Sequence, residues 1–207
     1  MRNAWGLEGR PSFSVVRVAR LIHLNGPPGI GKSTISRMYA DAHTGVLNLD
    51  IDMLRTLIGG WQRDFEHAGE LIRPAALAMI AGYLPTGNDV VLPSLLVRLD
   101  ELQRFESAAV EVGAEFQEIF LMDSKARCLS RFHMRGVNGQ DADPWHNQVR
   151  ALVESQGGDD VLAQYYDDLV ALIAKREKAI VIETTVGCID QTYTAVLNAL
   201  TPDARNV

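Results

Sequence analysis

The sequence has few cysteines and no long apolar run. Its 207 residues include only two cysteines. Cys128 falls in a predicted helix and Cys188 follows a predicted strand, so the pattern does not favour a disulfide framework and is typical of a reducing compartment. No stretch approaches 18 consecutive apolar residues, and residues 1–16 lack the apolar core of a signal peptide. We therefore expect a cytoplasmic protein without a membrane segment.

Positive charge is also scarce. Twenty Lys and Arg residues stand against 26 Asp and Glu, which gives a net charge of −6 at pH 7. Proteins that bind duplexes usually carry a basic surface, so a nucleic acid is not the favoured partner, although a local cationic cleft remains compatible with this balance. Hydrophobic residues make up 47% of the chain, enough for one sizeable core. We expect one domain over residues 18–207 after an extension over residues 1–17, for which disorder is one interpretation.

The strongest motif starts at Gly26 and reads G-x-x-x-x-G-K-[ST]. An apolar run precedes it and a helical pattern follows, which is the strand, loop and helix context that a phosphate-binding loop requires. Its backbone N–H groups and the positive end of the helix attract phosphate oxygens. Lys32 is expected to reach the β- and γ-phosphates, and Ser33 to bind Mg²⁺. The nucleotide-binding residues expected here are Gly26, Pro27, Pro28, Gly29, Ile30, Gly31, Lys32, Ser33 and Thr34. The alternative is a Gly/Pro turn before an ordinary helix.

Short apolar runs alternate with helical patterns along the whole chain. Strands separated by helices predict right-handed crossovers and a parallel sheet with helices on both faces. A ligand is then expected at the carboxyl ends of the strands. The predicted strands cover residues 19–24, 46–49, 89–92, 116–121 and 179–182.

Charged residues follow the second predicted strand, in the segment Asp50-Ile51-Asp52-Met53-Leu54-Arg55. Asp52 and Arg55 are three positions apart, so both can face one side of a first helical turn. A carboxylate there can accept the proton of an attacking hydroxyl, and the arginine can hold an anionic substrate or the transferring phosphoryl group. The alternative is a helix-capping Asp with a surface Arg. The phosphate loop makes the catalytic interpretation the preferred one.

Three arginines, Arg127, Arg131 and Arg135, are spaced four apart on the helix predicted after the fourth strand. They form a stripe apart from the apolar face of that helix, and a polar, glycine-containing segment follows. We expect a lid over about residues 133–146, with one arginine near the adenine and the others neutralising charge on the phosphoryl group. A solvated cationic face is the alternative.

The segment between the second and third strands, residues 56–87, is the candidate for binding the phosphoryl acceptor. Trp61, Arg63 and Arg73 are the expected acceptor contacts, since the segment mixes flat surfaces with hydrogen-bonding groups. An equally open interpretation is a capping helix whose charges face water. Its core-packing residues would be Leu77, Ile80 and Leu84.

With these motifs together, the chain resembles P-loop kinases of the small phosphotransferase group. That group includes chloramphenicol phosphotransferase, zeta toxins, shikimate and gluconate kinases, tunicamycin-resistance proteins and polynucleotide kinases. The resemblance covers about residues 18–200, and only its phosphate loop is highly specific. It implies a P-loop NTPase three-layer α/β/α sandwich whose five-stranded parallel sheet has the order 2-3-1-4-5, with a helical lid and with ATP and Mg²⁺ as cofactors.

The same resemblance implies residue roles. The Asp-x-x-Arg of polynucleotide kinases and zeta toxins maps the general base onto Asp52 and its partner onto Arg55, and the family lid carries the nucleotide-clamping role to the three arginines of the stripe. One departure concerns the third strand, which ends in Pro93-Ser94, where many P-loop proteins carry a Mg²⁺-holding carboxylate. Metal binding would then depend on Ser33 with Asp50 or Asp52 in the outer shell, and Asp50 becomes the rival for the base role.

These inferences predict a kinase that transfers the γ-phosphoryl group of ATP to a hydroxyl of a small molecule. An antibiotic, a nucleoside or a sugar nucleotide would fit. Two alternatives stay open: a polynucleotide 5′-hydroxyl kinase, and a nucleotide-binding switch that hydrolyses slowly. The sequence pattern favours neither ATP over GTP nor any oligomeric state.

Overall fold

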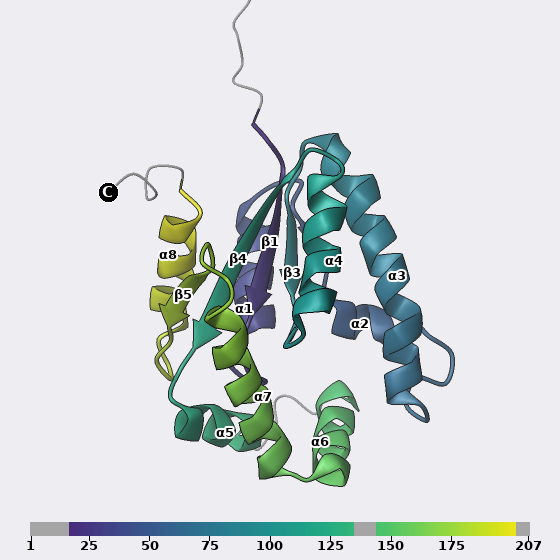
Figure 1. Cartoon of the computed structure of the whole chain (residues 1–207), viewed down its shortest axis with the longest axis vertical. Coiled ribbons are helices and arrows are strands. Elements are labelled where there is room, and N and C mark those ends of the chain that lie inside the picture. Colours follow the sequence, from purple (N-terminus) through teal and green to yellow (C-terminus); the bar gives the residue numbers. More distant parts are fainter. Residues whose placement is uncertain (1–16, 135–143, 202–207) are drawn as a thin grey trace, which may run out of the picture.

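A five-stranded parallel sheet forms the centre of the molecule (Figure 1). The computed structural model describes residues 17–134 and 144–201. The strands are β1 (Arg20–Asn25), β2 (Leu47–Asn48), β3 (Val90–Pro93), β4 (Glu115–Met122) and β5 (Ile180–Glu183). Their order is β2-β3-β1-β4-β5, which is the order that the family resemblance implies. Each strand lies within about two residues of its predicted position, because buried parallel strands read as nearly continuous apolar runs.

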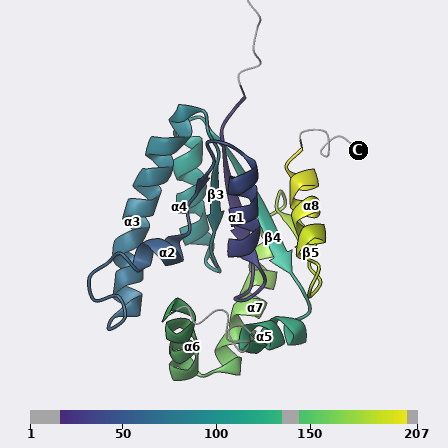
Figure 2. The same cartoon turned by 180° about the vertical axis from the view of Figure 1, so that it is seen from behind.

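Helices surround this sheet and also extend beyond one of its ends (Figures 1 and 2). They are α1 (Lys32–Ala42), α2 (Ile51–Arg55), α3 (Phe65–Tyr83), α4 (Leu99–Val110), α5 (Lys125–Met134), α6 (Pro144–Gln156), α7 (Asp159–Ile173) and α8 (Ile189–Ala199), with the short 3₁₀ helix η1 (Leu84–Thr86). Helices α3 and α4 cover one face of the sheet, α1 and α8 cover the other, and α5 to α7 gather at the carboxyl ends of the strands. None of the helices in the described residues is long and apolar enough to cross a bilayer.

The alternation of side chains along β1 explains why both faces of the sheet are buried. Leu21 packs in a cluster with α3 and α4, whereas Ile22 and Leu24 pack in a cluster with α1 and α8. The capping-helix interpretation of the acceptor segment is confirmed for its apolar side, because Ile80 and Leu84 are buried and Leu77 packs against them. The three-layer α/β/α architecture follows directly from these two clusters.

The register of the strands brings several loops to one edge of the sheet. Leu24 of β1 pairs with Pro93 of β3, and Asn25 pairs with Phe120 of β4. The chain therefore leaves β1, β3 and β4 at neighbouring points, and the phosphate loop begins at the centre of this edge. Most of the expected extension (residues 1–16) and most of the expected lid (residues 135–143) lie outside the described residues.

Candidate active site

The phosphate loop connects β1 to α1 through a backbone that only glycine allows at some positions. Gly26 has a φ of 145°, and a Cβ there would collide with the carbonyl oxygen of Leu121. Gly29 has a φ of 80°, and its Cβ would lie 3.2 Å from the backbone nitrogen of Phe132. Helix α1 begins at Lys32, and no side chain caps its first turn. The N–H groups of this turn therefore point toward a place where an anion can bind.

Lys32 lies over the loop to which it belongs. Its Nζ donates to the carbonyl oxygens of Gly26, at 2.7 Å, and Pro27, at 3.0 Å. These contacts keep the ammonium group at the loop, where phosphate oxygens would compete for the same three protons.

Arg131 of α5 reaches the phosphate loop from the lid side. Its Nη1 donates to Thr184 Oγ1 at 2.8 Å and to the carbonyl oxygen of Ile30 at 3.4 Å, while its Nε lies 3.8 Å from Asp123 Oδ2. Its side chain is only 13% exposed. The helix therefore holds this guanidinium against the loop, as the catalytic interpretation of the stripe requires.

The other two arginines of the stripe differ from Arg131. Arg127 pairs with Asp123 through its Nε and is 57% exposed, so this side chain fits the solvated alternative better. Its nucleotide-clamping role stays a prediction. Arg135 lies outside the described residues.

The acidic segment after β2 forms a short helix with a side-chain cap. Asp50 is the cap, since its Oδ1 accepts from the backbone N–H groups of Asp52 (3.0 Å) and Met53 (3.4 Å). Asp52 therefore falls in the first turn of α2 and Arg55 in the last. Asp52 Oδ1 lies 3.7 Å from Arg55 Nη2, so the two side chains face one another as their spacing predicts.

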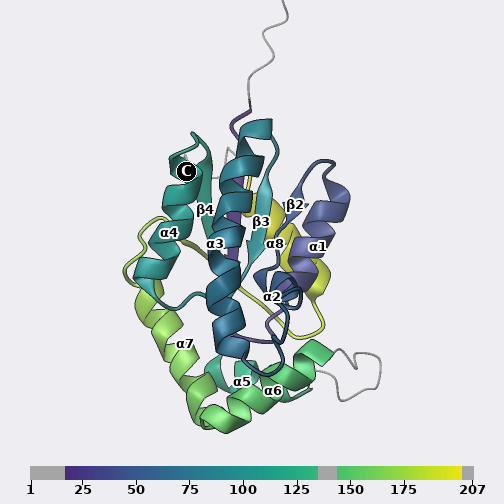
Figure 3. The same ribbon diagram turned by 90° about the vertical axis from the view of Figure 1, so that its right-hand side faces the viewer.

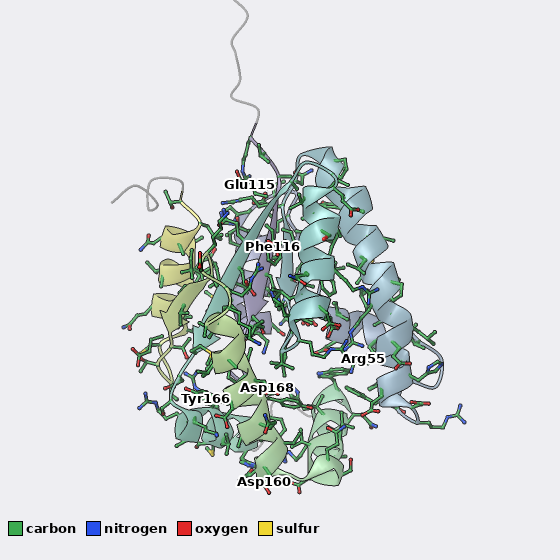
Figure 4. The ribbon with its side chains drawn as sticks, in the orientation of Figure 1. Arg55, Glu115, Phe116, Asp160, Tyr166 and Asp168 are labelled. Carbon is green, nitrogen blue, oxygen red and sulfur yellow. The ribbon has the colours of Figure 1, made fainter. Side chains whose placement is uncertain are left out.

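Arg55 is held in an aromatic setting that the sequence does not reveal (Figure 4). Its Cζ lies 4.1 Å from the ring centre of Phe65 in α3 and 5.4 Å from that of Trp145 in α6. A Cβ on Gly69 would lie 3.1 Å from Arg55 Nη2, so the absence of a side chain there makes room for the guanidinium. Arg55 is 8% exposed, and burial lowers its pKa from the ordinary value. The residue remains a cation, because arginine keeps its proton at any physiological pH.

These groups line a single cavity of about 700 Å³. Its wall includes residues 28–34 of the phosphate loop, residues 185–187 after β5, and Asp50, Asp52, Arg55, Arg73 and Arg131. Two expected acceptor contacts lie elsewhere. Trp61 packs on Trp145, with ring centres 5.8 Å apart, and Arg63 is exposed.

Comparison with known proteins identifies the fold family. The model of the AAA domain family matches residues 21–156, which is more than half of the chain. The chain belongs to this AAA domain family. No curated protein matches its sequence at a significant level.

Solved structures of similar fold include kinases. A gluconokinase from Sinorhizobium meliloti 1021 is 19% identical, with a TM-score of 0.55 over 89% of this chain and 94% of the other. A Chloroflexus aurantiacus protein classed as a kinase is 18% identical, with a TM-score of 0.59 over 89% of this chain and all of the other. A chain of the Pnkp1/Rnl/Hen1 RNA repair complex is 16% identical, with a TM-score of 0.59, and the match covers 78% of this chain but 47% of that one. The P-loop kinase-like fold is therefore confirmed.

This AAA domain chain also uses residues that sequence reasoning missed. The ring of Trp145 packs near the guanidinium of Arg55. Glu101 of α4 forms an ion pair with Arg73 in the cavity wall. The one sequence feature that could have indicated a role for Trp145 is its position at the start of a helix, soon after a polar segment. Nothing in the local pattern distinguishes Glu101 from a surface residue in the acidic first turn of α4.

Helix α6 lies beside the start of α3 and the loop before it, which belong to the acceptor segment (Figure 3). Several residues of α6, including Trp145, line the cavity. Gln148 Nε2 donates to the carbonyl oxygen of Gln62 at 2.7 Å, and Gln156 Nε2 donates to Glu66 Oε1 at 2.8 Å. Trp145 adds its contact with Phe65, whose ring centre is 5.1 Å away. The acceptor side is therefore enclosed by two elements that are far apart in the sequence.

The donor set fits a metal that arrives with a nucleotide. Among the described residues, no group of three or more His, Cys, Asp or Glu side chains could hold an ion by itself. Ser33 and the Asp50 carboxylate line the same cavity, so phosphate oxygens and water would complete a Mg²⁺ shell. Pro93 ends β3 without an acidic side chain, and the next residue, Ser94, donates its backbone N–H to the Leu24 carbonyl oxygen at 3.2 Å.

Proposed function

We propose that the protein is an ATP-dependent phosphotransferase that moves the γ-phosphoryl group to a hydroxyl of a small molecule. One observation carries the proposal: Asp52 and Arg55 share a cavity with Lys32 and Ser33 of the phosphate loop. A nucleotide switch needs the loop but has no need of a carboxylate and guanidinium pair beside it. A kinase needs both, because the acceptor hydroxyl must lose its proton as it attacks.

The positions of the side chains support the following chemical roles. Lys32 exchanges its carbonyl contacts for the β- and γ-phosphates. Ser33 and Asp50 would hold Mg²⁺, which would supply charge neutralisation. Asp52 accepts the hydroxyl proton while the acceptor oxygen bonds to phosphorus, and the bond from phosphorus to the bridging oxygen breaks to leave ADP. Arg55 and Arg131 stabilise the charge that spreads over the phosphoryl oxygens.

The enclosure by α6 supports a small acceptor. A cavity of about 700 Å³ falls within the range of ordinary small-molecule sites. Its acceptor end combines the Arg73–Glu101 pair with the aromatic faces of Phe65 and Trp145, which suits a polar molecule that contains a ring. A polynucleotide would have to displace the contacts of α6 with the acceptor segment, and the acidic net charge of the chain does not assist its binding.

A transfer screen tests the proposal. ATP and Mg²⁺ would be incubated with antibiotics, nucleosides, sugar nucleotides and 5′-hydroxyl oligonucleotides, with Lys32→Ala as the inactive control. We expect an acceptor-dependent phosphorylated product from one of the small-molecule classes and none from the variant. A product from the oligonucleotide alone would favour the polynucleotide kinase alternative. ATP binding without transfer to any acceptor would favour the switch.

A further inference from the structure

Asn25, the last residue of β1, makes three hydrogen bonds at the start of the phosphate loop. Its Oδ1 accepts from the backbone N–H of Gly26 at 2.8 Å and from that of Leu96 at 3.2 Å, and its Nδ2 donates to the Leu96 carbonyl oxygen at 2.8 Å. The side chain is completely buried. One amide group therefore joins the phosphate loop to the segment that follows β3.

That segment, residues 94–97, forms part of the cavity wall. Ser94, Leu95 and Val97 line the cavity, whereas Leu96 points into the core and is 2% exposed. The segment leads into α4, which carries Glu101 and its pair with Arg73. Asn25 thus touches the nucleotide side of the cavity through Gly26 and the acceptor side through Leu96.

The neighbours of Asn25 in β1 support the same connection. The Leu24 carbonyl oxygen accepts from the backbone N–H of Ser94, and His23 Nε2 lies 3.2 Å from the Ser94 carbonyl oxygen. All these partners are backbone groups, so the connection depends little on which side chains residues 94–97 carry. A buried amide whose donor and acceptor are both hydrogen-bonded holds its partners in place, because breaking any of these hydrogen bonds leaves a buried polar group unpaired.

We propose that Asn25 is a positioning residue that sets the distance between the phosphate loop and the acceptor-side segment 94–97. It touches neither reactant. Through its three hydrogen bonds, ordering of the phosphate loop by a nucleotide is passed to the wall against which the acceptor binds. The proposal rests on the proposed phosphotransferase function for its kinetic consequence, but its structural consequence does not depend on any acceptor.

Asn25→Asp is the sharpest variant, because it preserves shape and both acceptor contacts while it removes the donor to Leu96. An ionised carboxylate would face a carbonyl oxygen, whereas a protonated one could donate to it as the amide does. We expect kcat to fall by about tenfold or more near pH 8 while the Kd for ATP changes by less than about threefold. The ratio of variant to wild-type kcat should rise as the pH falls, because protonation restores the missing donor.

Asn88→Asp is the matched control. Asn88 lies at the opposite end of β3, where its side chain contacts Thr86 in a turn, and the same chemical change there should leave kcat at the wild-type value. Thermal unfolding of both variants would establish the folded fraction. The proposal is wrong if Asn25→Asp keeps the wild-type kcat, if its kcat falls only in proportion to the folded fraction, or if the variant loses ATP affinity and not kcat.

Amide hydrogen exchange separates this proposal from the proposed function. Binding of a non-hydrolysable ATP analogue to the wild type should slow exchange both in the phosphate loop and in residues 94–97. In Asn25→Asp the protection of residues 94–97 should be lost and that of the loop kept. If the exchange results are as expected but the wild-type protein transfers phosphate to no acceptor, the proposed phosphotransferase function is wrong and the connection through Asn25 is still supported. Protection confined to the phosphate loop in the wild type would overturn the connection even if transfer is observed.

Discussion

At the scale of single residues, the Asp52–Arg55 pair depends on how Arg55 is held. The guanidinium lies over the ring of Phe65, and a Cβ on Gly69 would lie 3.1 Å from its Nη2, so a side chain at position 69 would crowd it. A glycine inside a helix costs about 1 kcal/mol relative to alanine. Its presence in α3 is therefore explained by the space that Arg55 needs rather than by helix formation.

Two glycine substitutions in α3 test this explanation. Gly69→Ala should leave stability nearly unchanged, since better helix propensity offsets a Cβ placed 3.1 Å from Arg55 Nη2, and should reduce transfer activity by about tenfold through the displaced guanidinium. Gly82→Ala is the control. A Cβ there meets nothing within 4 Å, so this variant should gain up to about 1 kcal/mol and keep its activity. Urea unfolding and kcat measurements on both variants would check the prediction, and equal activity in the two would refute it.

At the scale of elements, α6 and the acceptor segment act together although their hydrogen-bonded residues are 86 and 90 positions apart in the sequence. Trp145 contacts Trp61, Phe65 and Arg55, whereas Trp61 has Trp145 as its ring partner. Helix α6 therefore does more than line the cavity, because its Trp145 helps to hold Arg55, the partner of the proposed general base.

Alanine substitution of the two tryptophans should consequently give unequal results. Trp145→Ala should raise the acceptor KM and lower kcat, together by about tenfold or more in kcat/KM, and should change the Kd for ATP little. Trp61→Ala should have a clearly smaller effect, since Trp61 does not line the cavity. Steady-state kinetics with the acceptor varied would measure both. Equal losses in the two variants would mean that Trp145 acts only through the aromatic cluster and not through Arg55.

At the scale of the whole molecule, a buried polar group in the sheet links stability to pH. His23 is fully buried in β1, and burial, the largest cause, lowers its pKa from 6.5 to about 3. The folded protein therefore keeps this histidine neutral where the unfolded chain protonates it. The stability that His23 contributes is present above pH 6.5 and is lost as the pH falls toward 3.

The titration of His23 predicts how the free energy of unfolding changes with pH between pH 6.5 and about 5.5. The single proton should lower the free energy of unfolding by an amount that approaches about 1.4 kcal/mol per pH unit below 6.5. His23→Gln should lose that dependence, as urea titrations at several pH values would show. The effect of Glu118 has the opposite sign, because burial raises the pKa of that carboxyl and its protonation favours the folded state. A variant with an unchanged slope would show that His23 is not the responsible group.

The fold could be predicted largely from the sequence, whereas the site could be predicted only in part. Apolar runs set the strands because a parallel sheet buries both faces. The loop and the Asp52–Arg55 pair are local in sequence, so spacing alone brought them together. Trp145 and Glu101 reach the cavity through tertiary packing, and the only local signal for either is the position of Trp145 at a helix start. The arginine stripe shows the same limit, since Arg131 contacts the phosphate loop whereas Arg127 pairs with Asp123 and is 57% exposed.

The most direct test of the central claim compares Asp52→Asn with Asp50→Asn in phosphoryl transfer and ATP binding. Asparagine still caps a helix, so Asp50→Asn should keep the geometry of α2. Any activity that this variant loses should be restored by additional Mg²⁺. Asp52→Asn should bind ATP as the wild type does and lose at least about a hundredfold in kcat, because the acceptor proton has no base. If Asp52→Asn turns over normally, or if Asp50→Asn alone is inactive at every Mg²⁺ concentration, Asp52 is not the general base and the proposed mechanism is wrong.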